Sequence, residues 1–167
     1  MGKYWWDQWE NSKYSHWKEK MIRLDMAVDI KKYDKVKNKF NEKNNRKFLY
    51  IGRNDLMKGT DFLSRLAKAC PEYEFGWIGP GDDIEGVNRI SNYVELTNEL
   101  MSKIAIDYDF FISTSRADPN PTTILETMAW GFPVLCTVQS GYYEDDVIAN
   151  IFLDDIENSK LILEKYQ

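Results

Sequence analysis

The sequence predicts an α/β domain built on a doubly wound parallel sheet of about six strands. Three observations support this fold class. From residue 47 onward, short apolar runs alternate with stretches whose apolar residues recur at helical spacing. The first two apolar runs each end in a glycine, which suits a strand that leads into a tight loop. The chain of 167 residues is long enough for one domain with its own core and hardly long enough for two.

The elements follow one another in a regular alternation. Strands are expected at residues 47–52, 74–79, 92–96, 108–114, 132–137 and 149–153. Helices are expected at 58–71, 97–106, 121–130 and 155–166, with a short helix or turn at 141–147. Thr97 is the expected N-cap of the second helix, and Pro71 ends the first. In such a sheet ligands bind at the carboxyl ends of the strands, so the residues that follow each strand are the candidates for function.

The N-terminal part of the chain has a different character. Residues 1–46 are interpreted as an aromatic and charged segment with an interdomain linker, and residues 47–167 as the domain. The stretch "KYWWDQWENSKYSHWKEK" (3–20) is compatible with an amphipathic helix. It holds the lone histidine, His16, for which a surface or packing role is favoured. Because the regular part has no histidine, no Ser/His/Asp or Cys/His arrangement can be completed there.

Composition narrows the function classes. The 22 basic and 27 acidic residues give a net charge of −5, which argues against a general binder of nucleic acid or anionic membranes. Cys70 and Cys136 have no metal-site spacing and form no disulfide framework, so a reducing, cytoplasmic location is expected. The sequence shows neither a membrane-spanning run nor a signal peptide.

Two loops after the early strands carry candidate binding residues. In "GRNDLMKG", Gly52 allows close approach of a ligand, and Arg53 and Lys58 are two cations that suit a diphosphate at a helix entrance. The alternative is a solvated loop with ordinary surface charges. In "GPGDD", Gly79 and Gly81 would let a sugar or phosphate approach, although a plain turn explains them equally well.

The stretch "RADPNPTTILETMAWGFPVL" (116–135) follows the fourth strand. Asn120 is the expected N-cap and Pro121 the first helical residue of a helix that ends before Gly131. Asp118 precedes this helix on the ligand side of the sheet, and Glu126 lies off its apolar face. One element thus offers free N–H groups and two carboxylates that can accept from sugar hydroxyls. A capped surface helix with an exposed glutamate is the competing interpretation.

Taken in order, these stretches resemble the C-terminal, donor-binding domain of GT-B glycosyltransferases, in particular the retaining group 1 family related to glycogen synthase. "FLYIGRNDLMKG" looks like the family's strand and G-R-x4-K-G, and "WIGPGDD" like its second strand and G-x-G. "STSRADPNPTTILETMAWGFPVL" looks like its E-x7-E region, and "RLDMAVDIKKYDK" like its linker. The resemblance covers about residues 22–167 and implies a Rossmann-like fold, the C-terminal half of a GT-B enzyme.

The resemblance also implies roles. Arg53 and Lys58 would hold the diphosphate of a UDP- or GDP-sugar without a tightly bound metal or cofactor, and Asp118 would contact the donor sugar. Glu126 would accept from the ribose hydroxyls. The other implied donor-binding residues surround sugar, phosphate or base, and they are Gly52, Gly79, Gly81, Tyr93, Val94, Asn120, Pro121 and Thr122.

The sequence departs from the family pattern at two residues and in the expected lack of an N-terminal domain. Asp118 is one methylene shorter than the usual Glu, and Pro121 replaces a Gly and removes an N–H. An N-terminal acceptor domain is missing, so the implied partners are a nucleotide sugar and that domain, with peripheral membrane association of the whole enzyme left open. The expected reaction is hexose transfer to a sugar or lipid-linked acceptor in polysaccharide biosynthesis, the isolated chain being inactive. The alternatives are a non-catalytic, degenerate module, a receiver-like domain and a nucleotide-sugar epimerase, the last two being disfavoured.

Overall fold

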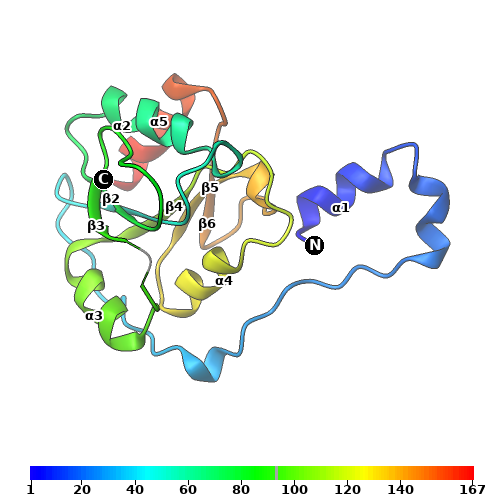
Figure 1. Cartoon of the computed structure of the whole chain (residues 1–167), viewed down its shortest axis with the longest axis horizontal. Helices are drawn as coiled ribbons and strands as arrows, with labels where there is room; N and C mark the ends of the chain where they lie inside the picture. The colour runs from blue at the N-terminus through cyan, green and yellow to red at the C-terminus, as the bar shows by residue number, and fades with distance from the viewer. Residues whose placement is uncertain (93) are drawn as a thin grey trace.

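The computed structural model describes residues 1–92 and 94–167, and six strands there form one parallel sheet (Figure 1). Their order across the sheet is β3-β2-β1-β4-β5-β6, and every neighbouring pair is parallel. The strands are β1 (Phe48–Ile51), β2 (Phe75–Ile78), β3 (Asn88–Ser91), β4 (Phe110–Ser113), β5 (Val134–Thr137) and β6 (Ile148–Ile151). The predicted Rossmann-like α/β fold is therefore confirmed.

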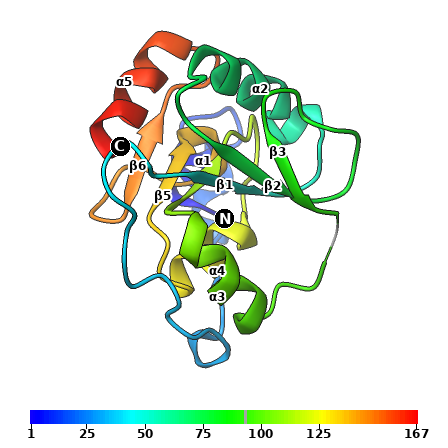
Figure 2. The same ribbon diagram turned by 90° about the vertical axis from the view of Figure 1, so that its left-hand side faces the viewer.

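Helices cover both faces of the sheet (Figure 2). Helices α2 (Thr60–Ala69) and α5 (Ile156–Tyr166) lie on one face, while α3 (Asn98–Asp107) and α4 (Thr122–Ala129) lie on the other. The expected cap of α3 is present, since the Thr97 hydroxyl accepts from the Leu100 N–H at 3.2 Å. Short 3₁₀ turns occur at Ser15–Lys20, Ile30–Lys32, Leu56–Lys58 and Val138–Ser140. No helix in the described ranges is long and apolar enough to cross a membrane.

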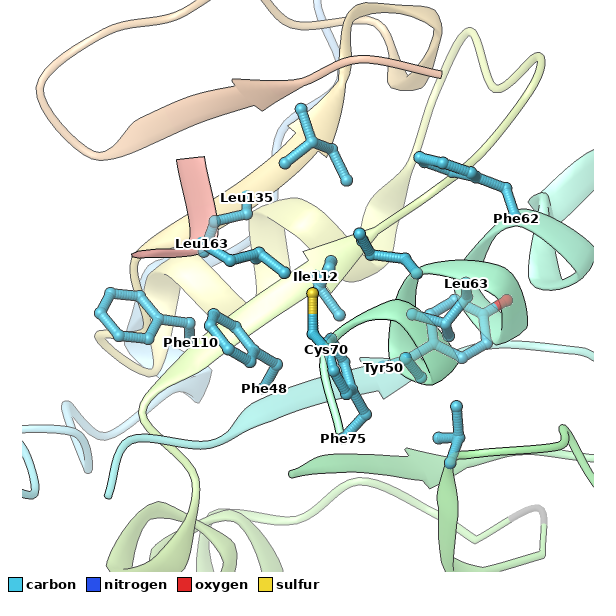
Figure 3. Packing of buried hydrophobic residues seen from close by; sticks show 14 of the residues in the cluster. Phe48, Tyr50, Phe62, Leu63, Cys70, Phe75, Phe110, Ile112, Leu135 and Leu163 are labelled. Carbon is cyan, nitrogen blue, oxygen red and sulfur yellow. The ribbon is translucent and has the colours of Figure 1, made fainter. Parts of the chain in front are cut away.

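The strands send alternate side chains to two separate cores, as the two-residue period of a strand requires. Phe48 and Tyr50 of β1 face the α2 and α5 side, whereas Leu49 and Ile51 face α3 and α4. Figure 3 shows the first core, where Phe48, Phe75 and Phe110 from three neighbouring strands come together. Because every residue of β1 is buried, this strand lies at the centre of the domain and holds the loop that follows it.

Several predicted boundaries are wrong. The third strand is Asn88–Ser91 rather than 92–96, and residues 94–96 have no regular structure. Asn120 does not cap α4; the N-cap position is Pro121, so that residue is not the first helical one. Of the helix or turn expected at 141–147, the structure has a turn at Gly141 and a bend at 146–147 and no helix. Helix α1 (Lys3–Glu10) covers only the first part of the expected helix at 3–20.

The segment before β1 is tied to the domain by a buried ion pair. Lys37 Nζ lies 2.8 Å from Asp109 Oδ1, and these side chains are 1% and 0% exposed. The Asp109 carboxylate also accepts from the Asn41 N–H at 2.8 Å and from the Lys47 N–H at 3.1 Å. Burial by itself would raise the pKa of Asp109, but the hydrogen bonds from Lys37, Asn41 and Lys47 outweigh it and hold the pKa below 3.8. Ionised Asp109 therefore anchors the linker beneath the sheet.

Candidate functional site

The candidate site lies at the topological switch point of the sheet, between two neighbouring strands whose following helices cover opposite faces. Strands β1 and β4 are neighbours at the centre, and the helices that follow them, α2 and α4, pack on opposite faces. Their loops must diverge, which leaves a crevice at the carboxyl ends of the two strands. Two of the stretches singled out in the sequence, 52–59 and 114–121, are these loops.

A cavity of about 610 Å³ opens at this crevice, a volume typical of small-ligand sites. One wall comes from the ends of β1 and β2, another from the start of α4, and a third from residues 94–96. The lining residues used below are Tyr33, Gly52, Arg53, Gly79, Val94, Thr122, Glu126 and Trp130. The cavity thus combines an apolar lining with the cation of Arg53 and the carboxylates of Glu95 and Glu126.

The loops after β1 and β2 are fixed to each other, which positions Arg53. The Gly52 carbonyl accepts from Trp77 Nε1 at 2.8 Å, and the Asn54 N–H donates to the Pro80 carbonyl at 3.0 Å. The Tyr50 hydroxyl donates to the Arg53 carbonyl at 2.8 Å. The backbone of Arg53 is held, while its side chain is 70% exposed and pairs with Asp55 at 3.2 Å. The exposed part of its guanidinium can meet an anion at the cavity.

Glu126 lies in the cavity wall beside two aromatic side chains. Burial raises the pKa of the Glu126 carboxyl above its ordinary 4.5, and a hydrogen bond from the Tyr33 hydroxyl partly opposes this shift. The Tyr33 ring meets Trp130 edge to face, with ring centroids 4.8 Å apart. Trp130 is fixed in turn by its Nε1, which donates to Asn98 Oδ1 at 2.7 Å. The carboxylate is held in place and half-desolvated, so hydroxyl donors from a ligand would bind it well.

Lys58 and Asp118 form an ion pair between the loops that follow β1 and β4, and neither residue lines the cavity. Lys58 Nζ lies 2.5 Å from Asp118 Oδ2, and both side chains are partly buried. The other carboxylate oxygen, Oδ1, accepts from the Asn120 N–H at 3.2 Å. The backbone of Asp118 donates to the Gln139 carbonyl at 3.0 Å. The two charges predicted for the site are thus in contact across the loops that follow β1 and β4.

Ion pairs of Arg116 with two aspartates fix the start of the loop after β4. Arg116 donates to Asp61 of α2 at 2.5 Å and to Asp154 of the β6–α5 turn at 2.5 Å. Arg65 also pairs with Asp154. The Arg116 N–H donates to the Met57 carbonyl at 2.8 Å. The loop that carries Asp118 is therefore fixed to three elements on its β4 side.

The structure brings most of the predicted residues to one end of the sheet. Arg53 and Glu126 share the cavity, and Lys58 and Asp118 pair with each other in the loops after β1 and β4. Gly81 packs against Asn54 rather than on the cavity, and Tyr93 lies outside the described residues. The predicted residues that do not line the cavity are Lys58, Gly81, Asp118, Asn120 and Pro121.

Sequence reasoning missed Tyr33 and Trp130. Tyr33 comes from the linker, 93 positions before Glu126, so no local pattern relates them. Trp130 directly follows α4, and its place four residues after Glu126 was the available signal, since that spacing puts both on one helix side. Among the residues that the structure describes, no three His, Cys, Asp or Glu side chains gather as a metal site.

Solved structures of glycosyltransferases contain a domain with a similar fold. The lipopolysaccharide outer core galactosyltransferase WaaB aligns with TM-score 0.60 and 20% identity, over 83% of this chain and 45% of its own. AviGT4, a glycosyltransferase of avilamycin A biosynthesis, gives 0.57 and 17%, over 84% and 48%. TarM gives 0.60 and 19%, over 83% and 30%. The chain therefore has the fold of a GT-B C-terminal domain and spans less than half the length of these proteins.

The sequence itself carries the family assignment. No curated protein matches the chain. The family model described as "Glycosyl transferases group 1" matches residues 45–159. This range holds β1 through the start of α5, and with it both loops of the candidate site. The chain thus belongs to the group 1 glycosyltransferases.

Proposed function

We propose that this chain is the nucleotide-sugar-binding part of a glycosyltransferase that moves a hexose from a UDP- or GDP-sugar to a sugar or lipid-linked acceptor. The observation that carries the proposal is the pairing of Arg53 and Glu126 in one cavity at the switch point of the sheet. A nucleoside diphosphate carries an anionic end and a ribose with two hydroxyls, which match a cation and a carboxylate in one cavity.

Each part of the donor has a proposed position. The diphosphate binds Arg53 and Lys58, whose charges stabilise the negative charge that develops as the sugar leaves. The ribose donates to Glu126, and the base lies against Gly79 and Val94. The sugar meets the loop at 118–122, which offers the Asp118 carboxylate and backbone N–H groups.

The transfer step is proposed to retain the anomeric configuration, on the strength of the sequence resemblance to the glycogen-synthase-like family. The acceptor oxygen bonds to the anomeric carbon. The bond from that carbon to the diphosphate oxygen breaks and leaves its electron pair on the oxygen. The acceptor's hydroxyl proton passes to the departing diphosphate. The acceptor-binding domain is proposed to lie outside these 167 residues, so the isolated chain should bind nucleotide weakly and transfer little.

A thermal-shift panel of UDP, GDP, ADP and their sugars tests the nucleotide site. A ligand at about one hundred times its Kd stabilises a protein by about 2.7 kcal/mol, which a melting experiment resolves. We expect one nucleotide series to raise the Tm of the wild type and of Arg23→Ala, a control arginine paired with Asp25 outside the cavity. Arg53→Ala should lose the shift.

Two results would contradict the proposal. Equal shifts in the wild type and in Arg53→Ala would remove the diphosphate assignment. No shift with any nucleotide would favour a non-catalytic module that keeps the fold alone.

A further inference from the structure

The N-terminal helix α1 is attached to the loop that carries Asp118. The Gly2 N–H donates to the Pro119 carbonyl at 2.7 Å, and Pro119 is the next residue after Asp118. A Cβ at Gly2 would lie 2.4 Å from the Gly141 carbonyl oxygen, so only glycine permits this approach. The start of α1 therefore fits between the loops that follow β4 and β5.

A second contact links α1 to the same loop. Trp5 Nε1 donates to the Gln139 carbonyl at 2.9 Å, and that carbonyl also accepts the Asp118 N–H at 3.0 Å. Tyr143 adds a third contact, because its hydroxyl donates to Asp7 at 3.1 Å. Helix α1 and the Asp118 loop thus share an acceptor and have a fixed mutual position.

Helix α1 carries four aromatic side chains that are half-buried and belong to neither of the two cores of the sheet. We call Tyr4, Trp5, Trp6 and Trp9 the α1 aromatic cluster; no residue of the helix is buried, and the Trp6 and Trp9 ring centroids lie 5.0 Å apart. An eight-residue helix has little stability by itself, so its attachment depends on the contacts with the domain. Tyr4 and Trp5 contribute to this attachment, whereas Trp6 and Trp9 pack against each other outside both cores and keep part of their ring surface exposed, so they offer a face to a ligand.

The polar groups around the cluster favour a neutral ligand. Lys3 neutralises Asp7 at 2.7 Å, and Lys18 neutralises Glu10 at 3.0 Å. Glu10 also accepts a hydrogen bond from Trp6, which orients that ring. With these charges paired, the helix has no surplus of positive charge to attract an anionic lipid surface. Flat aromatic faces bordered by hydrogen-bonding groups match a sugar ring, which has a C–H face and a rim of hydroxyls.

We propose that the α1 aromatic cluster binds a saccharide of the acceptor and presents it to the sugar bound at Asp118. The inference rests on the proposed function for the identity of the second substrate, and it assigns to this chain an acceptor subsite of its own. The saccharide stacks on Trp6 and Trp9, while Gly2 and Trp5 keep the cluster in register with the Asp118 loop.

The test uses the full 167-residue chain labelled with ¹⁵N, in which the six tryptophans give six indole signals. The probes are methyl α-glucoside, methyl β-galactoside and methyl N-acetyl-β-glucosaminide at millimolar concentrations. We expect at least one glycoside to shift the signals of Trp6 and Trp9 and to leave that of buried Trp77 unchanged. Trp6→Ala and Trp9→Ala should each weaken this binding by roughly tenfold, the value of one aromatic contact. Trp17→Ala, an exposed tryptophan outside α1, should not.

Gly2→Ala provides a variant outside the cluster. It should detach α1 through the clash with Gly141 and change the indole signal of Trp5, whose Nε1 would no longer donate to the Gln139 carbonyl. Nucleotide binding is measured in the same samples by thermal shift. If nucleotide binds and no glycoside shifts the α1 signals, the inference is wrong and the proposed function stands. If the glycoside shifts them and no nucleotide binds, the proposed function fails and the saccharide site remains.

Vesicles of phosphatidylcholine and phosphatidylglycerol form the comparison arm. Signal changes at Trp6 and Trp9 with vesicles but not with glycosides would overturn the proposal in favour of a lipid surface. Glycoside shifts that persist in the Trp6→Ala, Trp9→Ala double variant would also overturn it.

Discussion

Lys58 Nζ and Asp118 Oδ2 are 2.5 Å apart, so the cation expected at the diphosphate is already neutralised by the carboxylate expected at the donor sugar. The two residues come from loops after β1 and β4, which are 60 positions apart in the chain. A diphosphate that binds Lys58 must compete with Asp118 for it. Binding of the proposed nucleotide-sugar donor to Lys58 would therefore change the position of Asp118 as well.

Asp118→Asn should strengthen binding of UDP or GDP, because it frees Lys58 while keeping an oxygen acceptor for the Asn120 N–H. The pair is partly exposed, so we expect a gain of roughly threefold in affinity. Lys58→Ala should weaken binding several-fold. Isothermal titration calorimetry of both variants checks the prediction, and weaker nucleotide binding by Asp118→Asn would show that the two residues do not compete.

The pH dependence of nucleotide binding should report on Glu126. Burial raises the pKa of this carboxyl, so its ionised form costs stability in the free protein; the cost is absent below the unfolded pKa and complete above the folded one. Ribose hydroxyls favour the ionised form. Affinity should therefore fall as the pH is lowered from neutrality toward the raised pKa of Glu126, because the protonated carboxyl accepts less well from the ribose hydroxyls.

Glu126→Gln is the matched variant for this prediction. It should bind nucleotide more weakly at neutral pH, lose most of the pH dependence, and resist urea better than the wild type when no ligand is present. A variant that keeps the full pH dependence would place the responsible group elsewhere.

The buried pair of Lys37 and Asp109 should respond unequally to removal of either partner. Asp109→Ala strands a buried ammonium and the N–H groups of Asn41 and Lys47, for a loss of about 4 kcal/mol. Lys37→Met leaves the carboxylate with its N–H donors, so it should cost less, about 2 kcal/mol. Urea denaturation measures both. Lys103→Met, which breaks a pair with Glu99 that is 70% and 81% exposed, should change stability by less than about 0.5 kcal/mol.

Gly59 and Gly86 offer a controlled comparison of backbone strain. Both have left-handed φ, +67° and +82°. A Cβ at Gly59 would lie 1.9 Å from the Thr114 carbonyl oxygen, whereas one at Gly86 would come no closer than 3.4 Å to its neighbours. Gly86→Ala should cost about 1 kcal/mol and Gly59→Ala about 3 kcal/mol or more. Similar losses in thermal unfolding would mean that the Thr114 loop gives way easily.

The sequence predicts the central strands well because they are buried on both faces. Phe48–Ile51 and Phe110–Ser113 are continuous apolar runs, and such runs are unambiguous when bounded by turns. The edge strand Asn88–Ser91 pairs on one side only and is partly exposed, so it has no apolar pattern to find. Val94 and Leu96, which have strong strand propensity, instead pack partly against the core beside the cavity.

The sequence predicts only those parts of the candidate site whose residues follow the ends of strands or lie close together in the chain. The residues after β1 and β4 could be found because parallel strands end at one edge. Asn120 has the right side chain for a cap, yet its N–H is taken by Asp118 and the helix begins after Pro121. The approach of Tyr33 to Glu126, and of Gly2 to Pro119, depends on tertiary contacts that leave no periodic trace in the sequence.

Arg116 pairs with Asp61 and Asp154 and so fixes the strand-side end of the Asp118 loop to helix α2 and to the β6–α5 turn. Residues 118–120 are held by other partners, which are Lys58, the Gln139 carbonyl and the Gly2 N–H. These partners belong to the loop after β1, the loop after β5 and the N-terminal segment. Any change in the position of residues 118–120 would therefore alter contacts in all three segments, including the attachment of helix α1.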